Sequence, residues 1–243
     1  MKIKTIGIIG YGQFGKFLES LGKKYLKNIQ IKIYSKHNKI DNQKFFSLEE
    51  ITKSDILIIA TSIDKISETI QKIKNLISEN TIVVDVSTVK VHPEKEFKKA
   101  KIKKYLCTHP MFGPFSYQKI GNKLDDLRIV LTGHNLSKKE FNFFKKNFKK
   151  VKLKVIEIDS KTHDKLLAET LFLTHLIAQT VVKAKYQRTE IDTVSFGFLM
   201  HAIESVQNDK KLFQLVYKYN SYCKKVVEKI EKSFKTTKEE IKK

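Results

Sequence analysis

From Lys4 to Gly15 the chain has the sequence KTIGIIGYGQFG, and its architecture can be worked out from there. The apolar, β-branched run up to Gly10 is typical of a strand buried on both faces of a parallel sheet. After the glycines, apolar residues recur at helical spacing, which predicts a helix that packs on the sheet. They are Phe14, Phe17, Leu18 and Leu21. A strand, a glycine turn and a helix in this order favour a dinucleotide-binding turn over a chance glycine loop.

Each glycine of this GxGxxG turn has a physical task in such a site. Gly10 permits the tight turn, Gly12 lets a pyrophosphate approach the backbone, and Gly15 lets helix and strand pack closely. The amino-terminal end of the helix then faces the phosphates. We therefore predict that the cofactor is bound by Gly10, Gly12, Gln13, Phe14 and Gly15.

The second predicted strand, at 30–35, indicates which dinucleotide is bound. NAD-binding turns have an acidic residue about 20 positions after the glycines, because a carboxylate accepts hydrogen bonds from the ribose hydroxyls. This chain has Ser35, Lys36 and His37 there, and its first acid is Asp41. A hydroxyl and cationic groups suit a 2′-phosphate, so we predict NADP, with NAD as the alternative, and Ser35 and Lys36 as cofactor-binding residues. Lys36 could instead be one more surface lysine.

Five further apolar runs predict strands, and up to residue 158 they alternate with helices. The runs span 55–61, 81–86, 105–108, 127–132 and 153–158, and a lysine-rich helix is expected at 137–150. Such alternation predicts an α/β fold, a doubly wound, mainly parallel sheet of Rossmann type over residues 1–158. Thr61 and Ser62, where the third strand ends, are therefore also candidate cofactor-binding residues.

The remaining residues, 159–243, predict a second, all-helical domain. The segment 165–183 is apolar nearly all round and indicates a buried helix. Two more helices are expected at 192–207 and 208–234, and the tail from Lys235 is expected to fray. Because the last helix carries a long apolar stripe, it needs a partner of similar length, for which a homodimer is the simplest source.

The stretch His109-Pro110-Met111-Phe112-Gly113-Pro114 holds two of the chain's three prolines. Proline fixes φ and removes a backbone donor, so the preceding strand should end there and place His109 at its carboxyl end. Parallel α/β sheets have their chemistry at that edge. The fourth strand brings Ser87, Thr88 and Lys90 to the same edge. A proline-bounded turn with an ordinary histidine is the alternative.

Composition restricts the function classes. The formal net charge of +22 would suit nucleic acid or an anionic membrane surface. Of the 48 basic residues, however, only Arg128 and Arg188 are arginines, the residue type that binds guanine edges and phosphates with two hydrogen bonds. Lysines occur in every segment. We therefore expect a solvated lysine surface, no specific nucleic acid, and an anionic substrate or cofactor as a secondary reason for the charge.

Other features favour a soluble, cytoplasmic protein. Cys107 and Cys223 lie in different predicted elements and form no CxxC pair, as is usual for buried thiols in a reducing compartment. The amino terminus has no apolar signal core, and we expect no apolar stretch near the ~18 residues that span a membrane. No pair of histidines on a helix has metal-ligand spacing, so we expect no metal.

Together these motifs resemble the prephenate and arogenate dehydrogenases of tyrosine biosynthesis. In the first domain the likeness rests on the glycine turn at 10–15, DVSTVK at 85–90 and HPMFGP at 109–114, the most specific motif. In the second it rests on Thr162-His163-Asp164, Thr174-His175 and LFQLVYKYN at 212–220. The resemblance implies a nucleotide-binding domain followed by a helical dimerisation domain, with the active site between them.

The resemblance also implies the reaction and its residues. Hydride would leave the hydroxyl-bearing ring carbon for the nicotinamide while the ring carboxylate departs as carbon dioxide, and aromatisation would drive the reaction. His109 would be the base for the ring hydroxyl, a task that suits the ordinary pKa of histidine, about 6.5. Thr88 would hold the ring hydroxyl and the nicotinamide. The substrate would be bound by His175, Lys90 and Gly113.

The chain departs from the family in several places. Thr88 stands where the family usually has serine, which preserves the hydroxyl. Phe172 stands where many bacterial members have a further histidine, and Glu204 where prephenate-specific members have an arginine that binds a substrate carboxylate. Another base, such as Arg188, would then have to bind that carboxylate, or the substrate differs. The sequence around His175 is closer to plant-type arogenate dehydrogenases but does not separate prephenate from arogenate.

Other kinds of protein stay open from the sequence. A Rossmann dehydrogenase of the β-hydroxyacid type would share the glycine turn, but would normally need a catalytic lysine on the helical domain. A basic nucleic-acid-binding protein would use the net charge, and its affinity would fall steeply with salt. A cofactor-binding protein that has lost catalysis would account for Phe172 and Glu204.

Overall fold

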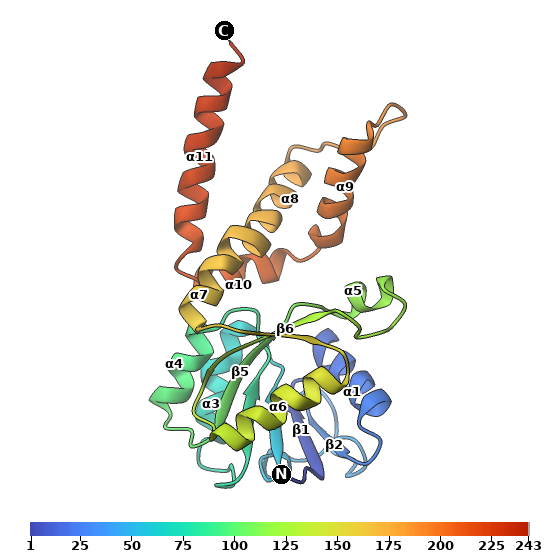
Figure 1. The fold of residues 1–243 in the computed structure, drawn as a ribbon, viewed down its shortest axis with the longest axis vertical. Coiled ribbons are helices and arrows are strands. Elements are labelled where there is room, and N and C mark those ends of the chain that lie inside the picture. Colours follow the sequence, from blue (N-terminus) through green and yellow to red (C-terminus); the bar gives the residue numbers. More distant parts are fainter. Residues whose placement is uncertain (243) are drawn as a thin grey trace. The chain divides into compact units, whose positions relative to one another are not determined.

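The computed structural model describes residues 1–242 of the chain. It divides into two compact units, Met1–Ser160 and Lys161–Lys243, close to the expected boundary between residues 158 and 159. The first unit holds a sheet with helices on both faces, and the second holds helices only (Figure 1).

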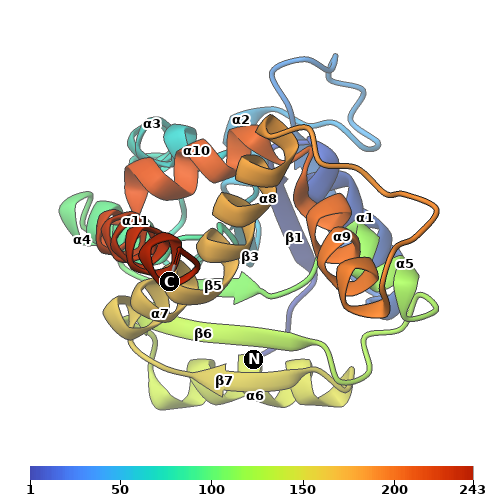
Figure 2. The same cartoon turned by 90° about the horizontal axis from the view of Figure 1, so that it is seen from above.

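Seven strands form one sheet in the order β2-β1-β3-β4-β5-β6-β7. The last three, β5, β6 and β7, lie side by side in Figure 2. They are β1 (Thr5–Ile9), β2 (Gln30–Tyr34), β3 (Ile56–Ile59), β4 (Ile82–Asp85), β5 (Tyr105–Pro110), β6 (Arg128–His134) and β7 (Lys154–Glu157). Neighbours are parallel from β2 to β5 and from β6 to β7, whereas β5 and β6 are antiparallel. The predicted doubly wound, mainly parallel sheet is confirmed.

The strands in the middle of the sheet differ from those at its edges. β4 and β5 are buried along their whole length, as apolar runs in a parallel sheet covered on both faces should be. The edge strand β2 is covered in part by the segment after it, because Ile33 N–H donates to Lys44 O at 3.0 Å and Phe46 N–H to Ile33 O at 2.9 Å. The opposite edge strand, β7, has Lys154 and Glu157 exposed at its ends.

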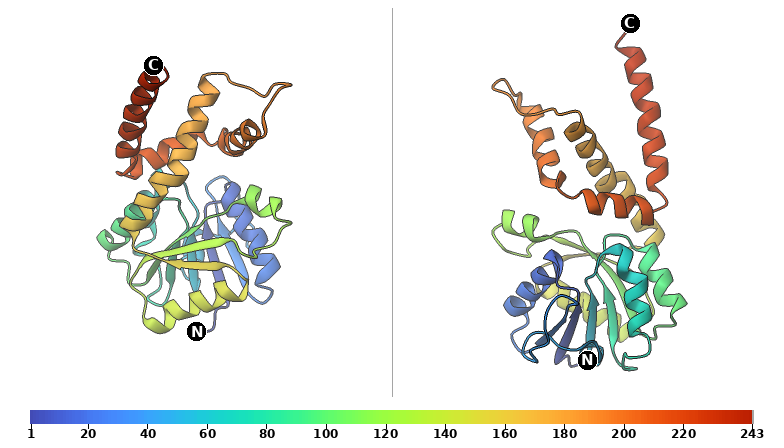
Figure 3. Two further views of the ribbon diagram at one scale, coloured as in Figure 1. Left: turned by 45° about the horizontal axis from the view of Figure 1, so that its top comes forward. Right: turned by 180° about the vertical axis from the view of Figure 1, so that it is seen from behind.

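The helices of the first unit lie on both faces of the sheet. They are α1 (Gln13–Tyr25), α2 (Leu48–Ile51), the short η1 (Ile63–Lys65), α3 (Ile66–Ile73), α4 (Val91–Lys99), α5 (Pro114–Lys119) and α6 (Lys138–Lys150). α1 and α6 pack on one face, and α3 and α4 pack together on the other (Figure 3). α6 begins at a capping box: Ser137 Oγ accepts from Glu140 N–H at 3.3 Å, and Glu140 Oε2 from Ser137 N–H at 2.9 Å.

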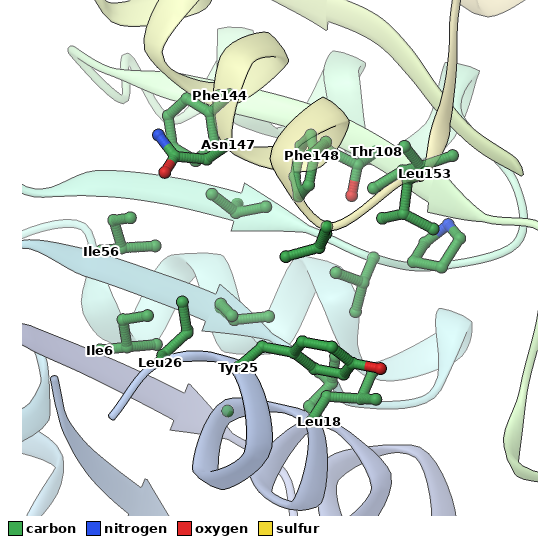
Figure 4. A pocket seen from close by; sticks show the side chains of 18 of the residues that line it. Ile6, Leu18, Tyr25, Leu26, Ile56, Thr108, Phe144, Asn147, Phe148 and Leu153 are labelled. Atoms are coloured by element: carbon green, nitrogen blue, oxygen red, sulfur yellow. The ribbon is translucent and has the colours of Figure 1, made fainter. Parts of the chain in front are cut away.

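An apolar cavity of about 240 Å³ lies between α1, α6 and the face of the sheet (Figure 4). Aliphatic and aromatic side chains such as Leu18 and Phe148 form nearly all of its wall. Its polar neighbours bond elsewhere, since Thr108 Oγ1 and Asn147 Nδ2 each donate to a backbone carbonyl. α5, in the connection from β5 to β6, contacts α1 and does not line this cavity.

The second unit is built around one long helical rod. Its elements are α7 (Ser160–Leu167), the π-helical turn η2 (Ala168–Phe172), α8 (Leu173–Lys183), α9 (Val194–Val206), α10 (Lys210–Tyr219) and α11 (Cys223–Glu240). η2 joins α7 to α8 without a break. α8 and α9 lie side by side, with a small buried cluster of Ala178, Met200 and Ile203 between them (Figure 3).

The helix expected over 208–234 is two helices, α10 and α11. Asn220 interrupts it, because its Nδ2 donates to Asp164 O at 2.7 Å and its Oδ1 accepts from Tyr222 N–H at 3.1 Å. A side-chain amide that bonds the backbone in this way competes with helix formation. The expected fraying from Lys235 is also wrong, since α11 continues to Glu240.

The apolar segment at 165–183 is less buried than the sequence predicts. Leu166 and Val182 are exposed. In the helix Ser160–Lys183, only 33% of the most apolar stretch of 18 residues is buried. This helix has 24 residues and a mean hydropathy of 1.2, so by length and composition alone it could cross a membrane. The expectation that no apolar stretch is long enough was therefore wrong, although core helices of soluble proteins have the same properties.

Candidate active site

The glycine turn joins β1 to α1 and leaves open space above it. Gly10 has a φ of +102°, a left-handed conformation that other residues rarely adopt. A Cβ on Gly15 would lie 2.1 Å from Gly10 O, so only glycine lets the helix come this close. A Cβ on Gly12 would meet nothing within 4 Å. This geometry fits a dinucleotide whose pyrophosphate approaches Gly12 and the amino-terminal end of α1.

A pocket of about 560 Å³ lies beside this turn. Four residues predicted to bind the cofactor line it together: Ser35, Lys36, Thr61 and Ser62. Thr61 Oγ1 is buried and has no hydrogen-bond partner. Because buried hydroxyls are normally bonded, this oxygen is available to a ligand in the pocket.

The two side chains at the start of α1 lie outside this pocket. Phe14 lines the apolar cavity and packs edge-on against Phe17, with 5.8 Å between ring centroids. Gln13 is the first residue of α1 and is exposed. Phe14 therefore anchors the helix through its side chain, and only its backbone faces the amino-terminal end where a phosphate would bind.

Two lysines that were not predicted, Lys65 and Lys72, line the same pocket. Together with Lys36 they surround Glu68, whose carboxylate oxygens lie 2.7 Å from Lys72 Nζ, 3.0 Å from Lys36 Nζ and 3.3 Å from Lys65 Nζ. These ammonium groups, Lys72 first, lower the pKa of Glu68 to about 2. The spacing of Lys65, Glu68 and Lys72 along one helical face was the signal in the sequence.

Lys90 is fully buried and bonds the protein itself. Its ammonium donates to the Asp85 carboxylate and to the Thr108 carbonyl, and Thr108 Oγ1 donates to Asp85 O at 2.8 Å. Burial raises the pKa of the Asp85 carboxyl, against the opposing effects of Lys90 and the Ser87 N–H. We therefore correct the expectation that Lys90 binds substrate: its charge is used to tie the turn after β4 to β5.

Thr88 and His109 both lie next to residues that this buried pair holds in place. Thr88 is partly exposed in the turn between Asp85 and Lys90, and Ser87 Oγ fixes that turn by donating to a backbone oxygen within it at 2.9 Å. His109 follows Thr108 on β5 and is 6% exposed. A hydroxyl in the turn after β4 and an imidazole on the neighbouring strand β5 thus lie at the edge that the sequence predicts.

β5 runs through Pro110 instead of ending before it. Pro110 pairs with Ile129 of β6, and Met111 N–H donates to Arg128 O at 2.9 Å. β4 pairs with β5 only as far as Cys107. Because Met111 donates toward β6, an N–H at position 110 would point to the side that has no strand. The proline is tolerated there because it removes no ladder hydrogen bond.

Gly113, expected to bind substrate, begins α5 as its N-cap. Its N–H donates to Ser116 Oγ at 3.0 Å, so that donor is used to start the helix. A Cβ on Gly113 would meet nothing within 4 Å, which leaves the space beside it open.

In the helical unit, His175 is buried beside an aromatic ring. It is 3% exposed, and its ring lies parallel to that of Phe213 with 6.5 Å between centroids. Burial lowers the pKa of the imidazole, against the opposing charge of Asp209. Its Nδ1 has no hydrogen-bond partner. A core histidine would normally be satisfied, so the open nitrogen favours a ligand-binding role.

Phe172 and Glu204, the positions that depart from the family, are both paired. Phe172 is fully buried in η2 and stacks on Phe213 with 5.2 Å between ring centroids. Arg188, which the sequence could not place, donates from Nε and Nη2 to the two carboxylate oxygens of Glu204 at 2.7 and 3.1 Å. A guanidinium therefore lies next to Glu204, the position where the resemblance leads us to expect an arginine in prephenate-specific members.

The open space over Gly12 and the pocket beside it are what dinucleotide binding requires, and the first unit is a Rossmann dinucleotide-binding domain by its fold. Its sequence identifies the family. Residues 27–157, more than half of the chain, match the nucleotide-binding domain of prephenate dehydrogenase. The chain belongs to the prephenate dehydrogenase family, as its resemblance predicts. The glycine turn itself lies before the matched residues.

Two curated relatives from Arabidopsis thaliana are arogenate dehydrogenases. Arogenate dehydrogenase 2, chloroplastic, is 26% identical over an alignment of 251 residues, which covers 97% of this chain and 69% of the relative. Arogenate dehydrogenase 1, chloroplastic, is 27% identical over 97% of this chain, but the chain spans only 39% of that relative's length.

Solved structures share the fold. The prephenate dehydrogenase of A. aeolicus, in complex with hydroxyphenyl propionate and NAD+, superposes with a TM-score of 0.79 at 18% identity, over 99% of this chain and 91% of that one. A Synechocystis arogenate dehydrogenase superposes with a TM-score of 0.72 at 16% identity, over 96% and 90%. These likenesses confirm a Rossmann-type sheet followed by a helical region.

Proposed function

We propose that this chain catalyses the NAD(P)-dependent oxidative decarboxylation of prephenate, arogenate or both. Membership of the family supports the reaction class. The observation that carries the proposal is the buried Asp85–Lys90 pair, which fixes the Thr88 turn to the strand that holds His109. A base on a strand, and a hydroxyl in a turn that is fixed to that strand, are what proton removal from a ring hydroxyl requires.

Each residue has a defined task in this reaction. His109 accepts the hydrogen bond, and then the proton, of the ring hydroxyl, and the Thr88 hydroxyl holds that oxygen. A bound nicotinamide would accept hydride from the carbon that bears the hydroxyl. The electrons of the bond to the ring carboxylate stay in the ring as carbon dioxide leaves, which makes the ring aromatic, and the proton returns to the phenol oxygen. His175 binds the substrate through its free ring nitrogen.

The proposed cofactor is NADP, with NAD as the alternative. Ser35 and Lys36 line the nucleotide pocket, and no carboxylate directly follows β2. We expect a higher kcat/KM with NADP than with NAD, and Lys36→Asp should lower that ratio. A wild-type enzyme that prefers NAD by about tenfold, or about 1.4 kcal/mol, would contradict this choice.

The proposed assembly is a homodimer formed through the helical unit. On α9 and the loop before it, Ile191, Val194 and Phe198 are 89%, 77% and 74% exposed. A second copy could cover such a surface. We also propose a small-molecule substrate and a cytoplasmic location; the two Arabidopsis relatives are named chloroplastic.

The activity test mixes purified protein with NADP or NAD and with prephenate or arogenate, and follows the absorbance of reduced nicotinamide. Reduction with at least one substrate is expected, and no reduction with either would contradict the proposal. His109→Asn keeps a hydrogen-bonding side chain but removes the base. It should fold and bind NADP, yet lose on the order of 10²-fold or more in kcat.

His134→Asn is the matched control, because His134 is exposed at the end of β6 and does not line the nucleotide pocket. It should keep the wild-type kcat. For the wild type, kcat/KM should rise with pH through about 6 to 7, where an ordinary imidazole ionises, and His109→Asn should lose this rise. If His109→Asn stayed within a few-fold of wild type, His109 would be only a strand residue.

A further inference from the structure

Three lysines gather around one carboxylate of the first unit, two from the same helical segment and one from the end of β2. Lys36 follows β2, Lys65 belongs to η1, and Lys72 lies in the last turn of α3, together with Glu68 on the same helix. Both oxygens of Glu68 are used: Oε1 contacts Lys36 and Lys72, and Oε2 contacts Lys65. Lys65 and Lys72 are near Glu68 in sequence, at helical spacing, whereas Lys36 reaches it from the end of β2, 32 residues earlier.

This cluster lies where the adenosine end of a dinucleotide would be. All four side chains line the pocket that also contains Gly10 and Gly12. In a Rossmann domain the pyrophosphate binds over the glycine turn, and the adenosine ribose lies over the carboxyl end of the second strand. Lys36 is at that end, so the lysine cluster borders the place of the ribose 2′ position.

The charge of the cluster matches a phosphate monoester. Three ammonium groups and one carboxylate sum to 3 − 1 = +2. A phosphate monoester carries about −1.5 to −2 charges near neutral pH and offers three strong acceptor oxygens. Glu68 alone leaves most of the donor capacity of the lysines unused, since each ammonium has three donors.

We propose that Lys65 and Lys72, with Lys36, bind the 2′-phosphate of the cofactor, and that Glu68 is the counter-charge that the phosphate replaces. This inference rests on the proposed nicotinamide cofactor but not on the substrate. Glu68 holds the three ammonium groups together while no phosphate is bound. Because Glu68 then competes with the phosphate for the same donors, its removal should strengthen the binding of a 2′-phosphate.

A different role for Glu68 would be to accept the 2′-hydroxyl of NAD, the task that a carboxylate after β2 usually has. The two roles predict different effects of Glu68→Gln on the affinity for nucleotides without a 2′-phosphate. If Glu68 is only a counter-charge, NAD and 5′-AMP bind the wild type and Glu68→Gln equally. If it accepts the ribose hydroxyl, both bind Glu68→Gln more weakly.

The test is isothermal titration of 2′,5′-ADP, 5′-AMP, NADP and NAD into the full-length protein. Lys65→Gln and Lys72→Gln should each raise the Kd for 2′,5′-ADP and NADP by about fivefold, the usual size for one exposed charge pair. Their Kd values for 5′-AMP and NAD should stay at the wild-type level. Lys74→Gln is the matched control: Lys74 is the exposed C-cap of α3 and does not line the pocket.

Glu68→Gln should lower the Kd for 2′,5′-ADP and leave that for 5′-AMP unchanged. The inference is overturned if the two lysine variants bind 2′,5′-ADP like the Lys74→Gln control, or if Glu68→Gln weakens 5′-AMP and NAD. Titration needs no turnover, so inactivity toward prephenate and arogenate would overturn the proposed reaction and leave this result standing. A wild type that binds none of the four nucleotides would overturn both.

Discussion

The two units of this chain cover their apolar side chains to different extents. In the sheet unit, β4 and β5 have no exposed residue, and helices lie on both faces. In the helical unit, Ala178, Met200 and Ile203 form only a small buried cluster, while Phe198 on α9 is exposed. The sheet unit therefore buries its central strands completely, whereas the helical unit leaves apolar side chains exposed that a further apolar surface could cover.

The largest effect should come from breaking the sheet unit from within. Lys90→Met removes the partner of the buried Asp85 carboxylate and leaves it without its counter-charge. The free energy of unfolding should fall by about 3–5 kcal/mol, as is usual when one member of a buried ion pair is removed. Urea unfolding followed by circular dichroism measures this change.

Two controls for Lys90→Met distinguish a buried ion pair from an exposed one, and an unpaired charge from a neutral pair. Lys98→Met breaks an exposed ion pair with Glu94 and should cost less than about 1 kcal/mol. The double variant Asp85→Asn/Lys90→Met should recover part of the lost stability, because no unpaired charge stays buried. A Lys90→Met protein as stable as the wild type would mean that the sheet unit does not depend on this pair.

The next largest effect is expected at the exposed apolar face of α9, where we propose that a second copy binds. Phe198→Glu places a charge on the exposed apolar face of α9 and should weaken a dimer by about 2 kcal/mol or more, roughly 30-fold in Kd. Sedimentation velocity over a range of concentrations measures it. Leu76→Glu, at an exposed apolar position after α3, should change nothing. If Phe198→Glu sediments like the wild type, α9 is not the interface.

A smaller effect is the loss of stability that protonation of His175, in the helical unit, should cause at acid pH. Burial holds the pKa of His175 below its ordinary value, so the unfolded chain takes up this proton at a higher pH than the folded chain does. The contribution is complete above about pH 6.5 and is lost as the pH falls below it, by at most about 1.4 kcal/mol per pH unit. Thermal unfolding of wild type and His175→Gln between pH 5 and 7.5 measures the difference, and parallel profiles would contradict it.

The smallest effect is expected at Arg188. Its bond to Glu204 is exposed to solvent, so Arg188→Ala should change the free energy of unfolding by less than about 1 kcal/mol. Chemical unfolding measures the change, and a larger loss would show that another surface covers the pair. A raised KM for prephenate or arogenate with unchanged stability would instead assign Arg188 to the substrate.

The local parts of the fold were predictable because short-range physics determines them. Gly10 and Gly15 follow from backbone geometry at one turn, and the buried strands follow from runs of apolar residues. Asn220 could not be predicted to break a helix, because the carbonyl that it bonds belongs to Asp164, 56 residues away. Pro110 within β5 likewise depends on which side of the strand has a neighbour.

The candidate site was predictable where single residues carry the chemistry and not where charges meet in space. His109 follows from its place after an apolar run. Lys90 was expected to bind substrate, and only the fold shows the Asp85 carboxylate that lets this lysine be buried. Lys65 and Lys72 were hidden among many lysines, although their spacing from Glu68 is helical. The approach of Lys36 to Glu68 needs the return of the chain from β2 to α3.

The two edges of the sheet have a consequence for solubility. An open edge strand presents unpaired N–H and C=O groups, to which a strand of another molecule can add and start aggregation. The segment at 44–46 blocks part of β2, whereas β7 has only charged ends, with Lys154 beside Asp126 and Glu157 beside Lys145. Neutralising Lys154 and Glu157 together should make the protein precipitate from its β7 edge while its fold stays intact.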